Sequence, residues 1–209
     1  MRYSVIMLLC GALTAWGCSP EVAGPIAFHS EDAALEPPPP PTADECRVPD
    51  PPPETIPWSN TAPALEAYCT AFWVTQGEDQ ELSVGFASDD RVKARWFLRL
   101  FIPEGAQFVD DAGMTVPDGS RVRVTVAIHR TLYAVQFGPH GSEFQVGRPA
   151  VLKLNYSWAD LGKQDAKDLT IYYQADEGGT WAKEPTIVDR RGNYVSTWLR
   201  HFSNYAVAW

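Results

Sequence analysis

The residues near the C-terminus carry the arrangement with the most specific chemistry. His201-Phe202-Ser203 places an imidazole two positions before a hydroxyl. A serine hydroxyl can attack the preceding carbonyl when the peptide is strained and a nearby histidine takes its proton; water then hydrolyses the resulting ester. In this interpretation Ser203 is the nucleophile, His201 is the base, and the bond after Phe202 breaks. The favoured alternative is a final strand that buries Phe202 and turns the other two residues outward, because strain is not visible in a sequence.

A set of basic residues forms the second candidate site. They lie on two segments that we expect to be strands, 91–102 and 121–129. If these strands are neighbours, the side chains form a positive stripe suited to a phosphate, a sulfated sugar or an acidic partner, since arginine makes bidentate contacts with anions. The favoured alternative is a solvated sheet face, and the acidic N-terminal segment could also fold back on the stripe. The residues are Arg91, Lys93, Arg95, Arg99, Arg121 and Arg123.

Other patterns that carry catalysis are absent from the sequence. There is no His-Glu-x-x-His, no Gly-x-Ser-x-Gly and no phosphate-binding glycine loop. We therefore expect neither an enzyme acting on an external substrate nor a bound cofactor. Acidic pairs could lend carboxylates to calcium, but none matches a calcium loop, and we expect no metal site. These pairs are Asp89-Asp90, Asp110-Asp111 and Asp176-Glu177.

The tryptophans could bind carbohydrate by stacking if they were exposed. The chain contains 8 of them. We assign Trp96, Trp181 and Trp198 to the core of the domain, which is the usual place of large aromatic side chains.

The first 17 residues have the features of an export signal. Met1-Arg2 is positively charged, Val5 to Leu13 is apolar, and small residues precede Cys18. In the favoured interpretation Cys18 is lipidated, as in bacterial lipoproteins, although Ala15 stands where leucine is usual. In the other, an ordinary cleavage leaves Cys18 unmodified. Both predict an extracytoplasmic protein of a bacterial cell envelope, periplasmic or anchored to the outer membrane.

The remaining cysteines suit an oxidising compartment. Cys46 and Cys69 form an even pair once Cys10 and Cys18 are set aside. A bridge between them would close a loop of roughly 24 residues and add about 3 kcal/mol of stability. The alternative is a pair of free thiols.

Residues 18–60 have the composition of a disordered linker. Pro37 to Pro41 and Pro51 to Pro53 favour extended backbone and remove hydrogen-bond donors. Acidic residues outnumber the single basic Arg47 in this segment. We expect an extended spacer, and no arm for nucleic acid or anionic lipid.

Residues 61–209 are expected to form one all-β domain. Apolar residues alternate with polar ones, and Gly- and Pro-containing turns separate the segments. This pattern predicts an antiparallel β-sandwich. The expected strands are 82–87, 91–102, 121–129, 151–156, 169–174, 187–189, 194–199 and 202–209.

Several short motifs in this domain resemble a known family. They are Phe101-Ile102-Pro103-x-Gly105, Phe137-Gly138-Pro139-His140-Gly141-x-x-Phe144, Pro149-Ala150-Val151-Leu152 and His201-Phe202-Ser203-x-Tyr205-Ala206. Their order resembles a ZU-type β-sandwich over residues 95–209, the module of ankyrins, netrin receptors, tight-junction scaffolds and many bacterial surface lipoproteins. The resemblance implies an interaction or structural domain without a cofactor. The His201-Phe202-Ser203 tripeptide also resembles the self-cleavage site of a death-domain protein that carries ZU-type modules.

These observations lead to one functional hypothesis and two alternatives. We expect an exported, lipid-anchored protein that acts as a non-enzymatic interaction or structural module of the cell envelope. Its partner would be an envelope protein or a surface polymer, it would reach the membrane through its anchor, and it would bind no nucleic acid. The alternatives are self-cleavage between Phe202 and Ser203, and binding of carbohydrate or anions.

Overall fold

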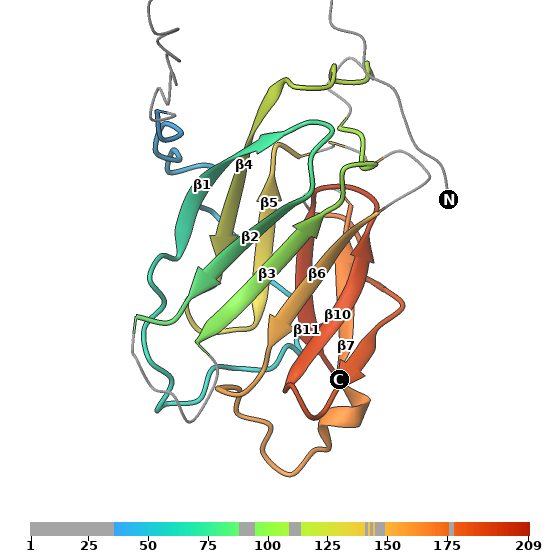
Figure 1. Cartoon of the computed structure of the whole chain (residues 1–209). Helices are drawn as coiled ribbons and strands as arrows, with labels where there is room; N and C mark the ends of the chain where they lie inside the picture. The colour runs from blue at the N-terminus through green and yellow to red at the C-terminus, as the bar shows by residue number, and fades with distance from the viewer. Residues whose placement is uncertain are drawn as a thin grey trace, which may run out of the picture. The chain divides into compact units, whose positions relative to one another are not determined.

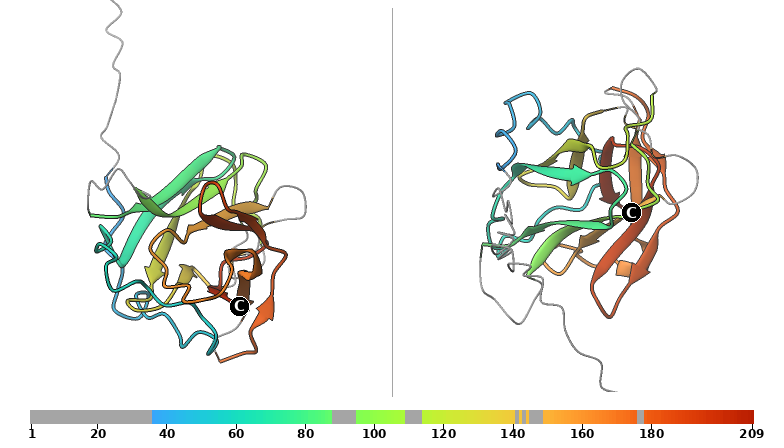
Figure 2. Two further views of the ribbon diagram at one scale, coloured as in Figure 1. Left: turned by 90° about the horizontal axis from the view of Figure 1, so that it is seen from below. Right: turned by 45° about the horizontal axis from the view of Figure 1, so that its top comes forward.

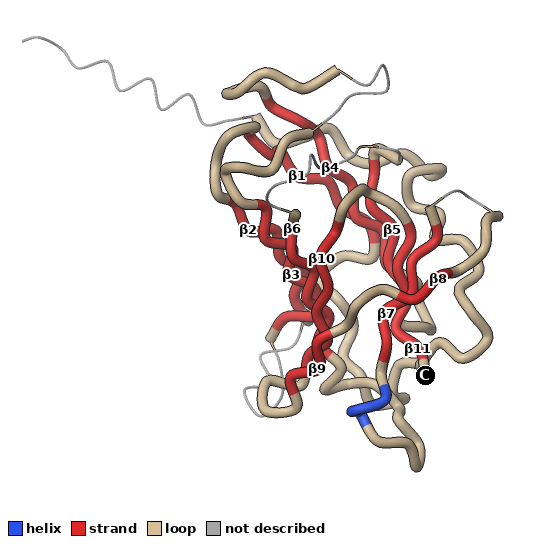
Figure 3. Tube along the Cα trace, turned by 90° about the vertical axis from the view of Figure 1, so that its right-hand side faces the viewer, coloured by secondary structure: helices blue, strands red, loops and turns tan. Residues whose placement is uncertain are grey.

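The strands form two antiparallel sheets. The computed structural model describes residues 36–87, 95–108, 114–140, 142, 144, 149–175 and 178–209. The six-stranded sheet contains, in spatial order, β1 (Cys69–Thr75), β4 (Arg121–Ile128), β5 (Ala134–Gly138), β11 (Asn204–Ala208), β7 (Thr170–Gln174) and β8 (Ala182–Lys183). The five-stranded sheet contains β2 (Gln80–Gly85), β3 (Trp96–Ile102), β6 (Ala150–Asn155), β10 (Tyr194–Leu199) and β9 (Ile187–Asp189). Figure 1 labels most of the strands, and Figure 3 shows the sheets side-on as two layers.

This arrangement confirms the expected all-β class and antiparallel sandwich. Helical structure in the described residues is limited to the 3₁₀ turn η1 (Ala166–Asp168), which leads into β7. Within the same residues no helix has the length and apolar character needed to cross a membrane.

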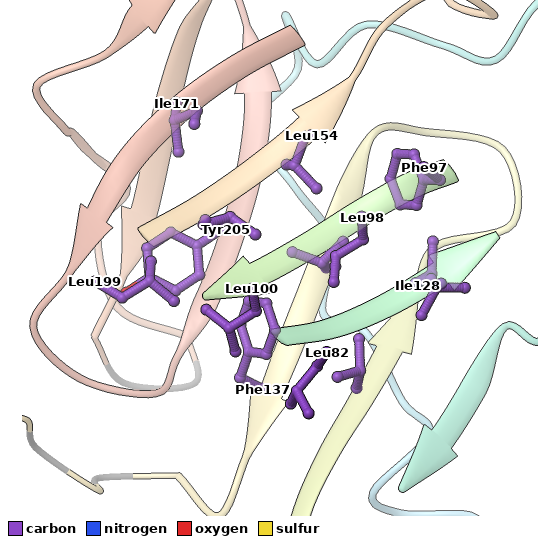
Figure 4. Packing of buried hydrophobic residues seen from close by; sticks show 14 of the residues in the cluster. Leu82, Phe97, Leu98, Leu100, Ile128, Phe137, Leu154, Ile171, Leu199 and Tyr205 are labelled. Carbon is purple, nitrogen blue, oxygen red and sulfur yellow. The ribbon is translucent and has the colours of Figure 1, made fainter. Parts of the chain in front are cut away.

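The core lies between the sheets. Figure 4 shows Leu98, Leu100 and Leu154 from the five-stranded sheet directed toward Phe137 and Tyr205 of the other sheet. All of these side chains are buried. Burying one large apolar side chain contributes about 1.5–3 kcal/mol, so the alternating pattern is what holds the two layers together.

A β-bulge changes the pattern at Phe97. Alternation predicts that this ring lies on the polar side of β3, but the structure buries it fully. Val84 pairs with Leu98 and Gly85 pairs with Trp96, so the intervening Phe97 has no partner on β2. An unpaired residue in a bulge can turn its side chain to the other face. The ring packs against Trp58 and Tyr133, with centroids 4.7 and 5.5 Å away.

The segment before β1 packs on the sandwich. We call residues 37–58 the N-terminal strap. It belongs to the compact unit that extends from Pro37 to Trp209. The Cys46–Cys69 disulfide, predicted from the even pair, joins the strap to β1 with the two Cα atoms 5.4 Å apart. Figure 2 shows the strap, in blue, beside β1 and β4.

The strap corrects the expected linker boundary. Residues 18–60 were expected to be an extended spacer, but from residue 37 onward the chain contacts the domain. Ile56 is fully buried, and its N–H donates to the Val207 carbonyl at 3.0 Å. Thr55 also forms an isolated bridge with Ala208. The prolines of the strap lack backbone N–H donors, but burial of Ile56 and the Cys46–Cys69 bridge still attach the strap to the domain.

Period two fails at several positions of the six-stranded sheet. Thr125 and Ala127 of β4, and Asn204 and Ala206 of β11, are buried although they point away from the core. A strand covered on both faces loses its alternation. β1, whose residues are mostly partly buried, and β5, which begins with two consecutive buried residues, lack a clear alternation and were not predicted from the sequence.

Candidate functional site

The outer face of the five-stranded sheet carries rows of exposed side chains. Residues directly opposite in antiparallel strands point to the same face. Phe101 of β3 pairs with Val151 of β6, which pairs with Trp198 of β10. The next row contains Arg99, Lys153, Ser196 and Ile187. We call this surface the aromatic–basic face; it is made of Trp96, Arg99, Phe101, Val151, Lys153, Ile187, Tyr194 and Trp198.

Most of the strongly exposed large apolar side chains in the described residues lie on this face. Trp198 is 60% exposed, Ile187 64% and Phe101 39%. Met114, in the loop before β4, is the other such residue among the described ones. Clustered apolar exposure of this kind marks interaction surfaces more often than scattered single residues do.

Two cations on the same face lie over aromatic rings. The Arg99 guanidinium is 4.8 Å from the Trp96 ring centroid, and the Lys153 ammonium is 5.3 Å from that of Tyr194. The two rings are themselves 6.0 Å apart. Cation–π contacts of this kind hold the charged groups in place.

A shallow hollow lies between these groups. It has a volume of about 270 Å³ and is lined by Glu81, Arg99, Phe101, Val151 and Lys153. Arg99 Nε is buried and makes no hydrogen bond; the nearest ion-pair oxygen, Glu81 Oε1, is 3.5 Å away. A buried donor without an acceptor is costly, so an added oxygen in the hollow would be stabilised there.

The structure corrects the assignment of Trp198 to the core. Trp198 alternates with the buried Val195, Thr197 and Leu199 on β10, and therefore points outward. Trp96 and Trp181 are partly buried. Strict period-two counting along 194–199 would have placed Trp198 on the outer face, together with Tyr194.

The predicted basic stripe is not assembled. Arg99 lies on β3 in one sheet, whereas Arg121 and Arg123 lie on β4 in the other. Arg95 immediately precedes β3, and Arg91 and Lys93 fall outside the described residues. Strand adjacency, on which the stripe depended, is a property of the tertiary fold.

The arginines of β4 have partners of their own. Arg123 forms a bidentate ion pair with Glu45 of the strap and donates from Nε to the Pro39 carbonyl at 3.1 Å. The Arg121 guanidinium lies over the Trp73 ring, 4.4 Å from its centroid. The acidic segment thus folds back on part of the predicted stripe, as one alternative anticipated.

The ion pair changes the acidity of Glu45. The hydrogen bond from Arg123, together with one from the Thr42 N–H, lowers the pKa of Glu45 from 4.5 to about 2. The strap is therefore held by a carboxylate that stays ionised down to acidic pH.

The His201-Phe202-Ser203 segment lies at the start of β11. Phe202 is buried, as expected, and packs against Phe137 with ring centroids 5.7 Å apart. Ser203 is buried too, contrary to the outward placement of the alternative interpretation. Its hydroxyl donates to the carbonyls of Gln174 and Ala175 at the end of β7. The His201 ring lies 5.3 Å from that of Tyr173.

These contacts show what the segment does structurally. The Ser203 hydroxyl donates its proton in hydrogen bonds to backbone carbonyl oxygens, which are too weakly basic to remove it as a general base would. The Phe202 N–H donates to the Ser142 carbonyl, and the Ser203 carbonyl accepts from the Phe137 N–H. Together these bonds attach β11 to its neighbours. Self-cleavage stays an alternative that these contacts do not test.

A larger pocket lies under the strap. It has a volume of about 710 Å³ and includes the Cys46–Cys69 bridge, Tyr68, His129 and Arg130 in its lining. His129 Nδ1 accepts hydrogen bonds from the N–H groups of Thr131 and Leu132, at 3.3 and 3.1 Å. Burial lowers the pKa of His129, against the opposing charge of Asp50. The imidazole thus acts as a neutral acceptor that shapes the turn after β4.

Some predicted features fall outside the described residues. They are the signal segment 1–17, Cys18, and the acidic pairs Asp89-Asp90, Asp110-Asp111 and Asp176-Glu177. Among the residues that are described, no group of three or more His, Cys, Asp or Glu is arranged to hold a metal ion.

Comparison with known proteins gives no relative. No family model matches the chain, and neither a curated protein nor a solved structure matches it.

Proposed function

We propose that this protein is a non-enzymatic binding module of the bacterial cell envelope, and that its binding surface is the aromatic–basic face. The observation that carries this proposal is the concentration of exposed aromatic and aliphatic side chains on one sheet: Trp198, Ile187 and Phe101. The strap occupies part of the outer face of the other sheet, at Arg123, whereas the outer face of the five-stranded sheet carries the exposed aromatic and aliphatic groups.

The location in the envelope rests on two features. The Cys46–Cys69 disulfide supports an oxidising compartment. The N-terminal sequence up to Cys18 supports export and lipidation. On this proposal the chain before the strap tethers the domain to a membrane, and the resemblance to ZU-type sandwiches agrees with a role in interaction.

In-cell footprinting with hydroxyl radicals tests whether the face is covered. Oxidation of Trp198, Ile187 and Phe101 would be measured by peptide mass spectrometry in intact cells and in the purified full chain. We expect their oxidation to fall severalfold in cells, because a bound partner excludes solvent from the face.

The same experiment contains its references. Met114 is 66% exposed and lies outside the face, so its oxidation reports the radical dose. Trp73 lies on β1 of the other sheet, and its oxidation shows whether that sheet is also protected in cells. Equal oxidation of Trp198 in cells and in the purified chain, after scaling to Met114, would exclude this face as the binding surface.

A further inference from the structure

We infer that the ligand of the aromatic–basic face is an acidic polysaccharide, bound by stacking of sugar rings on the aromatic side chains and by pairing of a carboxylate or sulfate with Arg99 and Lys153. The inference rests on the proposed function and specifies its ligand class.

The aromatic side chains are spaced for a chain of sugars. Trp198 and Phe101 lie in one row, on strands separated by β6. Two interstrand spacings amount to about 10 Å, comparable to the length of a disaccharide. Val151 between them is apolar and small, so consecutive rings could lie across the row with their apolar faces on the sheet. Stacking on a flat aromatic surface needs no deep cleft.

The hollow supplies the anion site. Arg99 and Lys153 both line the hollow, and the buried Nε of Arg99 has no hydrogen bond. The one carboxylate in the lining is Glu81, which is half exposed and 3.5 Å from Arg99 Nε. Two cations against one carboxylate leave a net positive charge in the hollow. A ligand carboxylate or sulfate can accept from Arg99 and displace Glu81 toward solvent.

The chemistry of the face favours a glycan over a protein partner. The cores of protein interfaces are contiguous and apolar; arginine and aromatic residues are enriched there, but lysine and serine are depleted. Here Arg99, Lys153 and Ser196 form the row between the aromatic groups. Alternating rings and cations match a polymer whose repeating units present an apolar ring face and an acidic group.

The test measures binding of the purified full chain to heparin, hyaluronate and polygalacturonate, with dextran and hydroxyethylcellulose as neutral probes. We expect at least one acidic probe to bind, to quench tryptophan fluorescence, and to weaken as salt is added. The neutral probes should bind at least about tenfold more weakly, since they keep the stacking contacts but lose the charge pairs.

Single substitutions test each contact, because some should weaken binding and one should strengthen it. Trp198→Ala should weaken binding about tenfold and Lys153→Gln severalfold. Glu81→Gln should strengthen binding, because it removes the carboxylate that competes for Arg99 in the lining of the hollow. The matched control is Trp73→Ala, an aromatic beside an arginine on the other sheet, which should leave binding unchanged. Melting temperatures would verify that each variant is folded.

The outcomes separate the two proposals. Equal affinity for neutral and acidic probes, or weaker binding by Glu81→Gln, would overturn the acidic class. No binding to any acidic probe, with Trp198 still protected in cells, would overturn this inference in favour of another macromolecule while the binding face remains. Loss of protection in cells would overturn the proposed function itself.

Discussion

Glu45 of the strap and Arg123 of β4 form a bidentate ion pair on the outer face of the six-stranded sheet, with Arg123 Nη2 and Glu45 Oε2 3.3 Å apart. The two residues are 78 positions apart in the chain. Because the pair lies next to the Cys46–Cys69 bridge, a noncovalent and a covalent attachment hold the same part of the strap.

Glu45→Gln should lower the free energy of unfolding at pH 7 by about 0.5–1 kcal/mol, a small value because the pair is partly exposed. The folded-state pKa of about 2 lies below the ordinary value of 4.5, so the stabilisation is complete above pH 4.5 and is lost as the pH falls to about 2. Urea unfolding of wild type and variant should therefore converge over this range. Glu54→Gln, at an exposed strap position, is the matched control. A constant gap between wild type and Glu45→Gln from pH 7 to 2 would contradict the assignment.

Replacing both Cys46 and Cys69 by serine should lower the free energy of unfolding by about 3 kcal/mol, since the bridge restricts the unfolded chain. Chemical unfolding of the variant and of the oxidised wild type measures the difference. The loss should appear equally when the wild type is unfolded under reducing conditions. A difference below about 1 kcal/mol would show that the strap is held without the bridge.

Gly138→Ala should destabilise the sandwich by about 1–3 kcal/mol through overpacking. A Cβ at this position would clash with Thr125 Oγ1, on the paired strand β4. Thr125→Ala removes that oxygen. Gly138→Ala should therefore cost less stability in the Thr125→Ala background than in the wild type. Thermal unfolding of the wild type, the two single variants and the double variant gives a double-mutant cycle. Additive effects of the two substitutions would exclude this contact as the cause.

His129 should make stability depend on pH near neutrality. Burial lowers its pKa below 6.5 in the folded state, so the neutral imidazole stabilises the fold above pH 6.5 and this contribution is lost as the pH falls through the folded pKa. The nearby charged groups that line its pocket are Arg47, Glu66 and Arg130, and Asp50 opposes the shift. His129→Asn retains a side-chain acceptor for the turn and should remove the dependence in this window. Parallel stability curves for the two proteins between pH 7 and 5 would count against this role.

Ser203→Ala should lower the free energy of unfolding by about 1–2 kcal/mol, because the carbonyls at the end of β7 lose a buried donor. The intact denatured mass of the full chain, extracted from membranes, tests the catalytic interpretation of the same residue. We expect a chain uncut after Phe202 in both proteins, with an acyl mass on Cys18. A wild-type chain ending at Phe202 and restored by Ser203→Ala would establish self-cleavage.

Local sequence patterns were sufficient for the fold class and for much of the core. Leu98, Leu100 and Ile102 alternate on β3, and all are buried as expected. The even cysteine pair likewise predicted the observed bridge. The same rule, applied to 194–199, indicates an outward Trp198, so this part of the candidate site was within reach of the sequence.

What the sequence by itself determined is thus the alternation of each strand and the chemistry of the side chains on it. Only the tertiary structure decided which strands are neighbours: it separated Arg99 from Arg123 into different sheets and brought Phe101 into one row with Trp198. It also turned Phe97 inward and laid a proline-rich segment over β4. The physical reason is that pairing and packing join residues far apart in the chain, and their free energy depends on all the surfaces buried together, which no local pattern contains.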